Sequence, residues 1–180
     1  MSMTLLLGGV ASGKSRTATA LAAGTGRRVT LIVTAEALDD EMVARIARHR
    51  AQRPAAWTVV EEPIALTDAI ERIAAPGVLI VDCLTLWVSN LLGDDTMSDD
   101  EVLAHAAAAA KACASRDAQT IVVSNEVGAG IVPANALARR YRDLLGRVNA
   151  TFADEADTVA LMVAGRAVTL SDPMTTLEGR

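Results

Sequence analysis

The sequence has few aromatic residues, few cysteines and few lysines. Aromatic residues make up 2% of its 180 residues, whereas hydrophobic residues make up 51%, so Ala, Val, Leu and Ile must form the core. The two cysteines, Cys83 and Cys113, are too few for a disulfide framework and lack metal-ligand spacing, so we expect reduced thiols. No apolar run reaches the roughly 20 residues that a helix needs to span a bilayer.

The sequence also lacks an excess of positive charge. Its net charge at pH 7 is −5, which argues against a protein that coats nucleic acid. The short apolar run from Met3 to Leu7 has no basic region before it, so it predicts a strand and not a signal peptide. These features predict a cytoplasmic protein with no membrane span and no nucleic-acid partner.

A glycine-rich segment follows this first apolar run directly. Its residues have the spacing G-x-x-x-x-G-K-S of a phosphate-binding loop and are Gly8, Gly9, Val10, Ala11, Ser12, Gly13, Lys14 and Ser15. The glycines let successive N–H groups point at phosphate oxygens. The Lys14 ammonium suits the β and γ phosphates, and the Ser15 hydroxyl can ligate Mg²⁺. The segment therefore predicts nucleotide binding.

Short β-branched runs alternate with helical patterns along the chain. Strands are predicted at 3–7, 29–34, 57–60, 78–82, 119–124, 158–163 and 166–170. Helices are predicted at about 14–23, 39–51, 64–75, 84–92, 98–116 and 134–150. This alternation predicts an α/β fold of the RecA-like P-loop NTPase type, with a mostly parallel sheet flanked by helices, in a single domain over 1–180.

The end of the chain departs from the parallel pattern. Gly165-Arg166 joins the last two predicted strands as a hairpin, which makes the last strand an antiparallel edge strand. The tail over 171–180 holds little that could be buried and is predicted to be frayed.

Polar residues follow several of the predicted strands. In such sheets, ligands bind beyond the carboxyl ends of the strands. That rule selects the loop after Leu7, then Val33, Thr34, Ala35, Glu61, Asp82 and the segment 124–126. Asp82 ends an apolar strand, as expected for the carboxylate that holds Mg²⁺ directly or through water beside a phosphate-binding loop. Glu61 either accepts hydrogen bonds from a guanine edge or a ribose, or is a plain surface carboxylate.

The helix predicted at 39–51 contains a histidine, His49. At about 100° per residue, His49 lies on the same inward-facing stripe as Met42 and Ile46. Four arginines surround it in the sequence, namely Arg45, Arg48, Arg50 and Arg53. Two interpretations remain open from spacing alone. His49 is either a histidine at the margin of the core or a nucleophile kept neutral by cationic neighbours that also bind phosphate.

Several segments occur in an order that resembles a known family. They are Gly8-Gly9-x-x-Ser12-Gly13-Lys14-Ser15, Asp39-Asp40-Glu41-Met42, His49-Arg50-x-x-Arg53-Pro54, Trp57, Glu61, and Asn-Glu-Val-Gly-x-Gly-Ile-Val-Pro at 125–133. From about Thr4 to Leu170 the chain resembles the bifunctional adenosylcobinamide kinase and adenosylcobinamide-phosphate guanylyltransferase of cobalamin biosynthesis.

The resemblance implies a transferase with two reactions. The γ-phosphate of ATP or GTP passes to the hydroxyl of the aminopropanol arm of adenosylcobinamide. A histidine then attacks the α-phosphate of GTP, expels pyrophosphate and carries GMP, which adenosylcobinamide phosphate takes up to give adenosylcobinamide-GDP. The resemblance also implies a homo-oligomer, specifically a homotrimer.

The resemblance assigns roles to particular positions. His49 is the residue that becomes guanylylated, and Ser15 and Asp82 hold Mg²⁺. The implied nucleotide contacts are Gly8 to Ser15, Val33, Thr34, Ala35, Arg50, Ala51, Gln52, Arg53, Glu61 and Asp82. Glu126 either orients the cobinamide hydroxyl or has a structural role in the turn at 128–130.

Two other functions remain open from the residues themselves. The first is a simpler P-loop kinase of a small molecule or nucleoside, in which His49 is only structural. The second is a nucleotide-dependent switch with no acceptor substrate. Labelling with α-labelled GTP separates them from the bifunctional enzyme, because only a covalent histidine intermediate leaves label on the protein.

Overall fold

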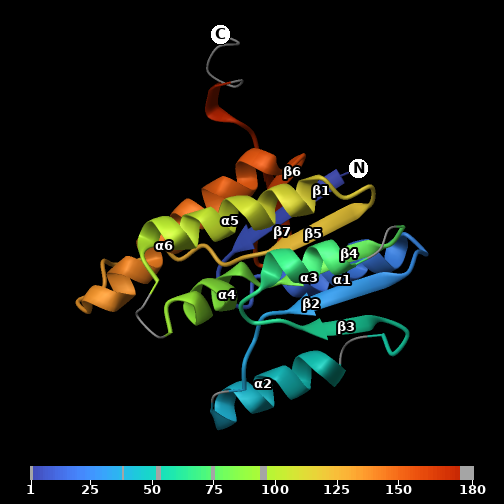
Figure 1. The fold of residues 1–180 in the computed structure, drawn as a ribbon, viewed down its shortest axis with the longest axis horizontal. Helices are drawn as coiled ribbons and strands as arrows, with labels where there is room; N and C mark the ends of the chain where they lie inside the picture. Colours follow the sequence, from blue (N-terminus) through green and yellow to red (C-terminus); the bar gives the residue numbers. More distant parts are fainter. Residues whose placement is uncertain (1, 38, 52–53, 74–75, 94–96, 175–180) are drawn as a thin grey trace.

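The strands of the chain form one sheet in the computed structural model, which describes residues 2–37, 39–51, 54–73, 76–93 and 97–174 (Figure 1). They are β1 (Ser2–Gly8), β2 (Val29–Val33), β3 (Thr58–Glu61), β4 (Val78–Asp82), β5 (Gln119–Val123), β6 (Thr158–Val163) and β7 (Arg166–Leu170). Their order is β3-β2-β4-β5-β1-β6-β7. All neighbouring pairs are parallel except β6 and β7. The prediction of a mostly parallel sheet with an antiparallel edge strand is confirmed.

Helices cover both faces of this sheet. They are α1 (Lys14–Gly24), α2 (Asp40–Ala51), α3 (Leu66–Arg72), α4 (Leu84–Leu91), α5 (Asp99–Ala114) and α6 (Ala136–Glu155). Helices α3, α4, α5 and α6 pack on one face, and α1 packs on the other. Helix α2 lies outside both layers, beyond β3 in Figure 1.

The two core layers follow from the alternation of side chains along each strand. In β1, Leu5 packs into the layer of α3 to α6, whereas Leu6 packs toward α1. Helix α1 contributes Ala18 and Ala22, whose small side chains let it lie close to the sheet. Trp87 packs in the layer of α3 to α6, on the other face of the sheet, and is 1% exposed. The core is thus mainly aliphatic, as the composition predicts.

Helices α6 and α3 end furthest from their predicted ends, each for a visible reason. Helix α6 continues past 150 because Phe152 is fully buried in the core. Helix α3 ends at Arg72, before the predicted end at 75. There Arg116 donates hydrogen bonds from Nη1 to the carbonyl oxygens of Ile73 at 2.8 Å and Ile70 at 3.4 Å. These bonds give partners to carbonyl groups at the end of the helix, where the backbone lacks donors of its own.

The predicted hairpin exists, but its turn lies one residue earlier than expected. Ala164 and Gly165 form the turn, with φ angles of 50° and 73°, and Arg166 already begins β7. Positive φ at both central residues is what a tight two-residue hairpin turn needs. Of the tail, residues 171–174 are exposed, and 175–180 lie outside the described residues.

Candidate active site

The glycine-rich loop leaves the carboxyl end of β1 and leads into α1. Gly8 is buried with a φ of 146°, and a Cβ atom on it would lie 2.3 Å from the carbonyl oxygen of Met162 in β6. Gly13, the residue before α1, has a φ of 100°. Only glycine fits position 8, because a side chain would be strained and would push β6 away. The loop shape therefore depends on its contact with the sheet.

Lys14 is held inside this loop and is 7% exposed. Its ammonium donates hydrogen bonds to the carbonyl oxygens of Gly8 at 2.8 Å and Gly9 at 2.7 Å, and to Ser12 Oγ at 3.3 Å. These acceptors fix a compact positive charge at the amino end of α1, where the helix dipole is also positive. This arrangement favours the binding of an anion.

The hairpin between β6 and β7 packs directly against the loop. The Gly165 N–H donates to the carbonyl oxygen of Ser12 at 2.9 Å, and a Cβ on Gly13 would lie 3.3 Å from the Gly165 Cα. Sequence reasoning predicted the hairpin but missed this contact. Two glycines near opposite ends of the chain give no local signal in the sequence that they approach each other.

Replacing Gly8 by alanine is expected to destabilise the protein by about 3 kcal/mol, from backbone strain plus overpacking against β6. Urea unfolding measures the change. Gly26→Ala is the matched control, because Gly26 also has a positive φ of 65° but no atom within 4 Å of the added Cβ. The control should lose only about 1 kcal/mol. Equal losses for both variants would show that the contact with Met162 is unimportant.

A cleft of about 430 Å³ opens in front of the loop, within the range of about 300–1,000 Å³ typical of ligand pockets. Residues 10–16 line it, together with Val33, Ala35, Met42, Ile46, Asp82, Cys83, Leu86, Val123, Asn125, Ala164 and Gly165. The structure thus brings most of the predicted loop residues together with Val33, Ala35 and Asp82. It also brings the apolar face of α2 to the same cleft.

Thr34 does not line this cleft, although its neighbours do. It is fully buried, and its hydroxyl donates to the carbonyl oxygen of Cys83 at 2.6 Å and accepts from the Cys83 N–H at 2.9 Å. These bonds join the ends of β2 and β4 beside Asp82. Burial, together with the charge of Asp82, raises the pKa of the Cys83 thiol to about 11, so the thiol is neutral at physiological pH.

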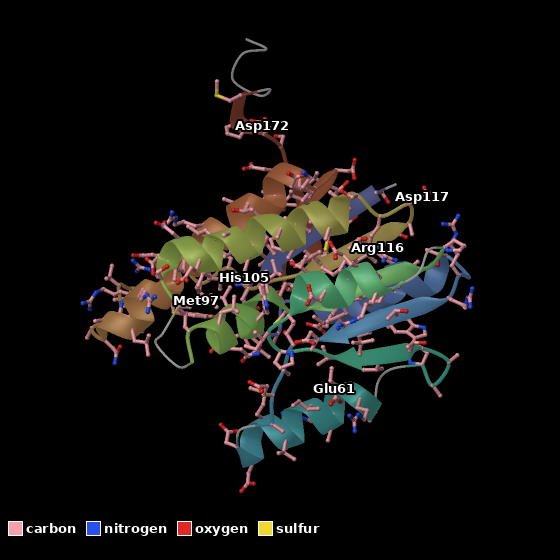
Figure 2. All side chains as sticks on the ribbon, viewed as in Figure 1. Glu61, Met97, His105, Arg116, Asp117 and Asp172 are labelled. Atoms are coloured by element: carbon pink, nitrogen blue, oxygen red, sulfur yellow. The ribbon has the colours of Figure 1, made fainter. Side chains whose placement is uncertain are left out.

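A second cleft, of about 730 Å³, lies between α2 and the end of β3. It shares Val33, Ala35 and Ile46 with the first cleft, so the two adjoin. Arg50 and Glu61 line it and form an ion pair at 2.6 Å. Figure 2 shows Glu61 in the space between β3 and α2.

The other residues of the predicted segment 49–53 are only partly described. Ala51 lines the second cleft. Gln52 and Arg53 lie outside the described residues, and of His49 the structure describes the helical backbone in α2 but not the side chain.

Two polar side chains of α4 hold the loops on either side of α2. Asn90 Nδ2 donates to the carbonyl oxygens of Thr34 at 2.7 Å and Pro63 at 3.1 Å, and Trp87 Nε1 donates to that of Ile64 at 2.8 Å. The ends of the segment that carries α2 are therefore fixed to the body. Sequence reasoning missed this role, because the carbonyl oxygens that the two side chains bind lie 23 to 56 residues away in the sequence.

The carboxylate of Glu126 accepts a hydrogen bond from the Gly128 N–H. This bond belongs to the turn in which the sequence allowed a structural role for Glu126. Within the described residues there is no group of three or more His, Cys, Asp or Glu side chains that could hold a metal ion. Nor does any helix in that part of the chain have the length and apolar character to cross a membrane.

The fold and the loop together define a P-loop α/β protein, a class in which the loop binds phosphate groups. Residues 4–170 match the family model described as cobinamide kinase / cobinamide phosphate guanyltransferase, CobU. The chain belongs to this family of bifunctional enzymes of cobalamin biosynthesis.

Curated relatives agree with this match over nearly their full length. The chain is 46% identical over 163 residues to the bifunctional adenosylcobalamin biosynthesis protein CobP of Pseudomonas aeruginosa, which covers 89% of this chain and 92% of that protein. It is 41% identical over 175 residues to the bifunctional adenosylcobalamin biosynthesis protein CobU of Escherichia coli, with 91% and 96% covered.

Solved structures support the fold. The RadB recombinase aligns with a TM-score of 0.51 at 14% identity, covering 89% of this chain and 73% of that chain. A Pyrococcus horikoshii protein aligns with a TM-score of 0.56 at 8% identity, covering 93% and 85%. At such low identity the likeness concerns the fold alone, and it confirms the RecA-like prediction.

Proposed function

We propose that the chain phosphorylates adenosylcobinamide with ATP or GTP and then transfers GMP from GTP through a covalent guanylyl-histidine at His49. In the second reaction an imidazole nitrogen bonds to the α-phosphorus. The bond to the α–β bridging oxygen breaks, and its electron pair leaves on pyrophosphate. A phosphate oxygen of adenosylcobinamide phosphate then bonds to the α-phosphorus, and the phosphorus–nitrogen bond breaks with its electron pair returning to the imidazole, which gives adenosylcobinamide-GDP. Family membership supports the two activities, and the adjoining clefts support where they occur.

The observation that carries this proposal is that α2 and the phosphate-binding loop border the same cleft. Met42 and Ile46 of α2 line it together with Lys14. Position 49 follows Ile46 by three residues and Met42 by seven, so it belongs to the same row of the helix. A nucleophile at this position would approach a triphosphate that the loop holds.

The loop supplies most of the charge stabilisation for either reaction. Phosphoryl transfer needs mainly alignment and neutralisation of charge on the leaving group. Lys14 and the amino end of α1 border the cleft, so the ammonium can exchange its bonds to the loop for bonds to a phosphate while it stays at the same place.

Ser15 and Asp82 fit the needs of a magnesium ion. Both are half-buried and line the same cleft, and one offers a hydroxyl and the other a carboxylate. Mg²⁺ usually takes one or two protein oxygens and completes its shell with phosphate oxygens and water. When bound, it supplies positive charge that stabilises the leaving phosphate.

The second cleft suits the rest of the nucleotide. We assign its contacts to Val33, Ala35, Arg50, Ala51 and Glu61, which line it and which the family resemblance also implies. The Arg50–Glu61 ion pair is 66% and 63% exposed at its two side chains, so solvent screens it and little is lost when it opens. An opened Glu61 can accept hydrogen bonds from the N1–H and N2–H groups of guanine, which would favour GTP over ATP in the transfer of GMP.

The proposal is tested with two radioactive nucleotides. With α-labelled GTP and no acceptor, the protein should retain acid-labile label, and the label should pass to adenosylcobinamide phosphate when that acceptor is added. With γ-labelled ATP or GTP, label should move to adenosylcobinamide. Retention of no α-label together with active phosphoryl transfer would indicate a simpler kinase. Slow hydrolysis without transfer to any acceptor would indicate a nucleotide switch.

The proposal extends to assembly and location. We propose a homo-oligomer, with the trimer that the resemblance implies as the expected state, and a cytoplasmic location. Sedimentation equilibrium measures the mass of the assembly, and cell fractionation tests the location.

A further inference from the structure

The segment that follows β5 runs alongside the phosphate-binding loop. The Ser124 N–H donates to the carbonyl oxygen of Leu6 at 3.0 Å, and the Glu126 N–H donates to that of Gly8 at 3.2 Å. The Lys14 ammonium donates to the same Gly8 carbonyl at 2.8 Å. Asn125 therefore lies next to the end of the loop that holds the lysine.

Two side chains, one from α4 and one from α6, hold the main chain of Asn125 in place. Its N–H donates to Thr85 Oγ1 of α4 at 2.8 Å, and its carbonyl oxygen accepts from Asn149 Nδ2 of α6 at 3.0 Å. Thr85 is itself held, because the Tyr141 hydroxyl donates to its carbonyl oxygen at 3.1 Å. Thr85 is 8% exposed and Asn149 is 5% exposed, so packing restricts both.

The hydrogen bonds to Thr85 and Asn149 use only the main chain of Asn125 and leave its side chain available. Asn125 is half-buried and lines the first cleft, and its side-chain amide has no hydrogen-bond partner among the residues that the structure describes. Two nearby atoms, Ser124 Oγ and Asn149 Oδ1, are buried and also have no hydrogen-bond partner among the described residues. The Asn125 amide borders the cleft, so its N–H groups are available to a ligand bound there.

We propose that the side-chain amide of Asn125 donates a hydrogen bond to the γ-phosphate while it is transferred to the cobinamide hydroxyl. Asn149 and Thr85 are positioning residues that hold the main chain of Asn125 and so keep this amide beside the loop. The inference rests on the proposed kinase activity and adds a residue to it. The γ-phosphate is the relevant group because the lysine of such a loop reaches the β and γ phosphates, and Asn125 lies beside that lysine.

The transfer itself does not use Asn125 as an acid or base. The acceptor hydroxyl oxygen bonds to the γ-phosphorus, and the bond to the β–γ bridging oxygen breaks. Its electron pair stays on the departing diphosphate, and the hydroxyl proton passes to solvent. The amide contributes a neutral donor, which binds the phosphate oxygens without repelling the Lys14 ammonium.

Nucleotide binding gives a test that does not depend on turnover. Calorimetric titration of Asn125→Ala should show affinity for the non-hydrolysable ATP analogue AMPPNP reduced about 10-fold, the size expected for one lost hydrogen bond to a charged group. Affinity for ADP, which has no γ-phosphate, should change less than about twofold. Equal losses for the two nucleotides, or no loss for AMPPNP, would overturn the proposal.

Kinetics provide the second test. Asn125→Ala should lower the kcat of phosphoryl transfer about 100- to 1,000-fold, the range for one lost donor to a developing charge, and the KM for ATP should rise in parallel with the dissociation constant for AMPPNP. Asn125→Asp keeps the shape and puts a carboxylate beside the phosphate, so it should lose more. Wild-type kcat in either variant would overturn the proposal, whereas a wild-type protein without kinase activity would instead refute the proposed function.

Asn149→Leu separates positioning from a structural role. This change removes the amide that holds Asn125 and also the unpartnered Oδ1, so the unfolding midpoint should change little while kcat falls about 5- to 10-fold. Asn135→Asp is the matched control, because Asn135 caps α6 away from the cleft and aspartate also caps well. A loss of stability in Asn149→Leu with normal kcat would overturn its positioning role.

Discussion

Replacing His49 by alanine is expected to lower the retention of α-labelled GMP on the protein by at least about 10³-fold, because no other group replaces a missing nucleophile. Phosphoryl transfer to adenosylcobinamide should stay within about threefold, since that reaction needs the loop and not the imidazole. The labelled protein is measured after acid-free gel filtration, and the phosphorylated product is measured in a parallel reaction. The two activities of the chain should thus separate in one variant.

The matched control uses the other histidine of the chain. The sequence contains two histidines, and His105 lies exposed on α5, away from both clefts. His105→Ala should retain full labelling. Label that survives in His49→Ala but disappears in His105→Ala would move the nucleophile to the other helix and contradict the proposed mechanism.

The parts of the fold that depend on local sequence were predictable. The β-branched runs at 29–34, 78–82 and 119–124 became strands, and the glycine-rich loop was recognised by its spacing. The alternation of strand and helix then led to a parallel sheet, because parallel neighbours need a crossover connection between them. The start of α5 at Asp99 also has a local cause, the capping box between Ser98 and Glu101.

The order of the strands was not predictable in the same way. Strand β5 lies between β4 and β1, which brings Asn125 beside Gly8. Nothing in the sequence near residue 125 indicates which strand it will join, because pairing partners depend on packing across the whole sheet. The contact of Gly165 with the loop arises for the same reason.

In the candidate site, too, the sequence indicated single residues, whereas their contacts with distant residues became visible only in the fold. Sequence reasoning selected Arg50 and Glu61 separately, yet the structure joins them as an ion pair across the second cleft. It also selected Thr34, whose fully buried hydroxyl instead joins the ends of β2 and β4. Residue types and strand ends indicate which residues lie near a ligand. Only the fold shows which of them are occupied by other protein groups.

Lys14 should be required for both activities, in contrast to His49. Lys14→Met keeps the length of the apolar stem but removes the charge that the carbonyl oxygens of Gly8 and Gly9 hold in the loop. We expect kcat/KM for phosphoryl transfer and the rate of guanylylation each to fall at least about 100-fold, because the loop loses its donor to the phosphates. Both rates are measured with the labelled nucleotides described above.

The controls for this variant test charge and shape separately. Lys14→Arg keeps the charge, but a planar guanidinium is too large for the site of the Lys14 side chain, which is 7% exposed and bonded to Gly8, Gly9 and Ser12, so it should rescue little activity. Lys111, the only other lysine in the sequence, is exposed on α5, so Lys111→Met should leave both rates unchanged. If Lys14→Met abolished phosphoryl transfer but left guanylylation intact, the two reactions would use different phosphate sites. The single cleft shared by α2 and the loop would then no longer account for the transfer of GMP.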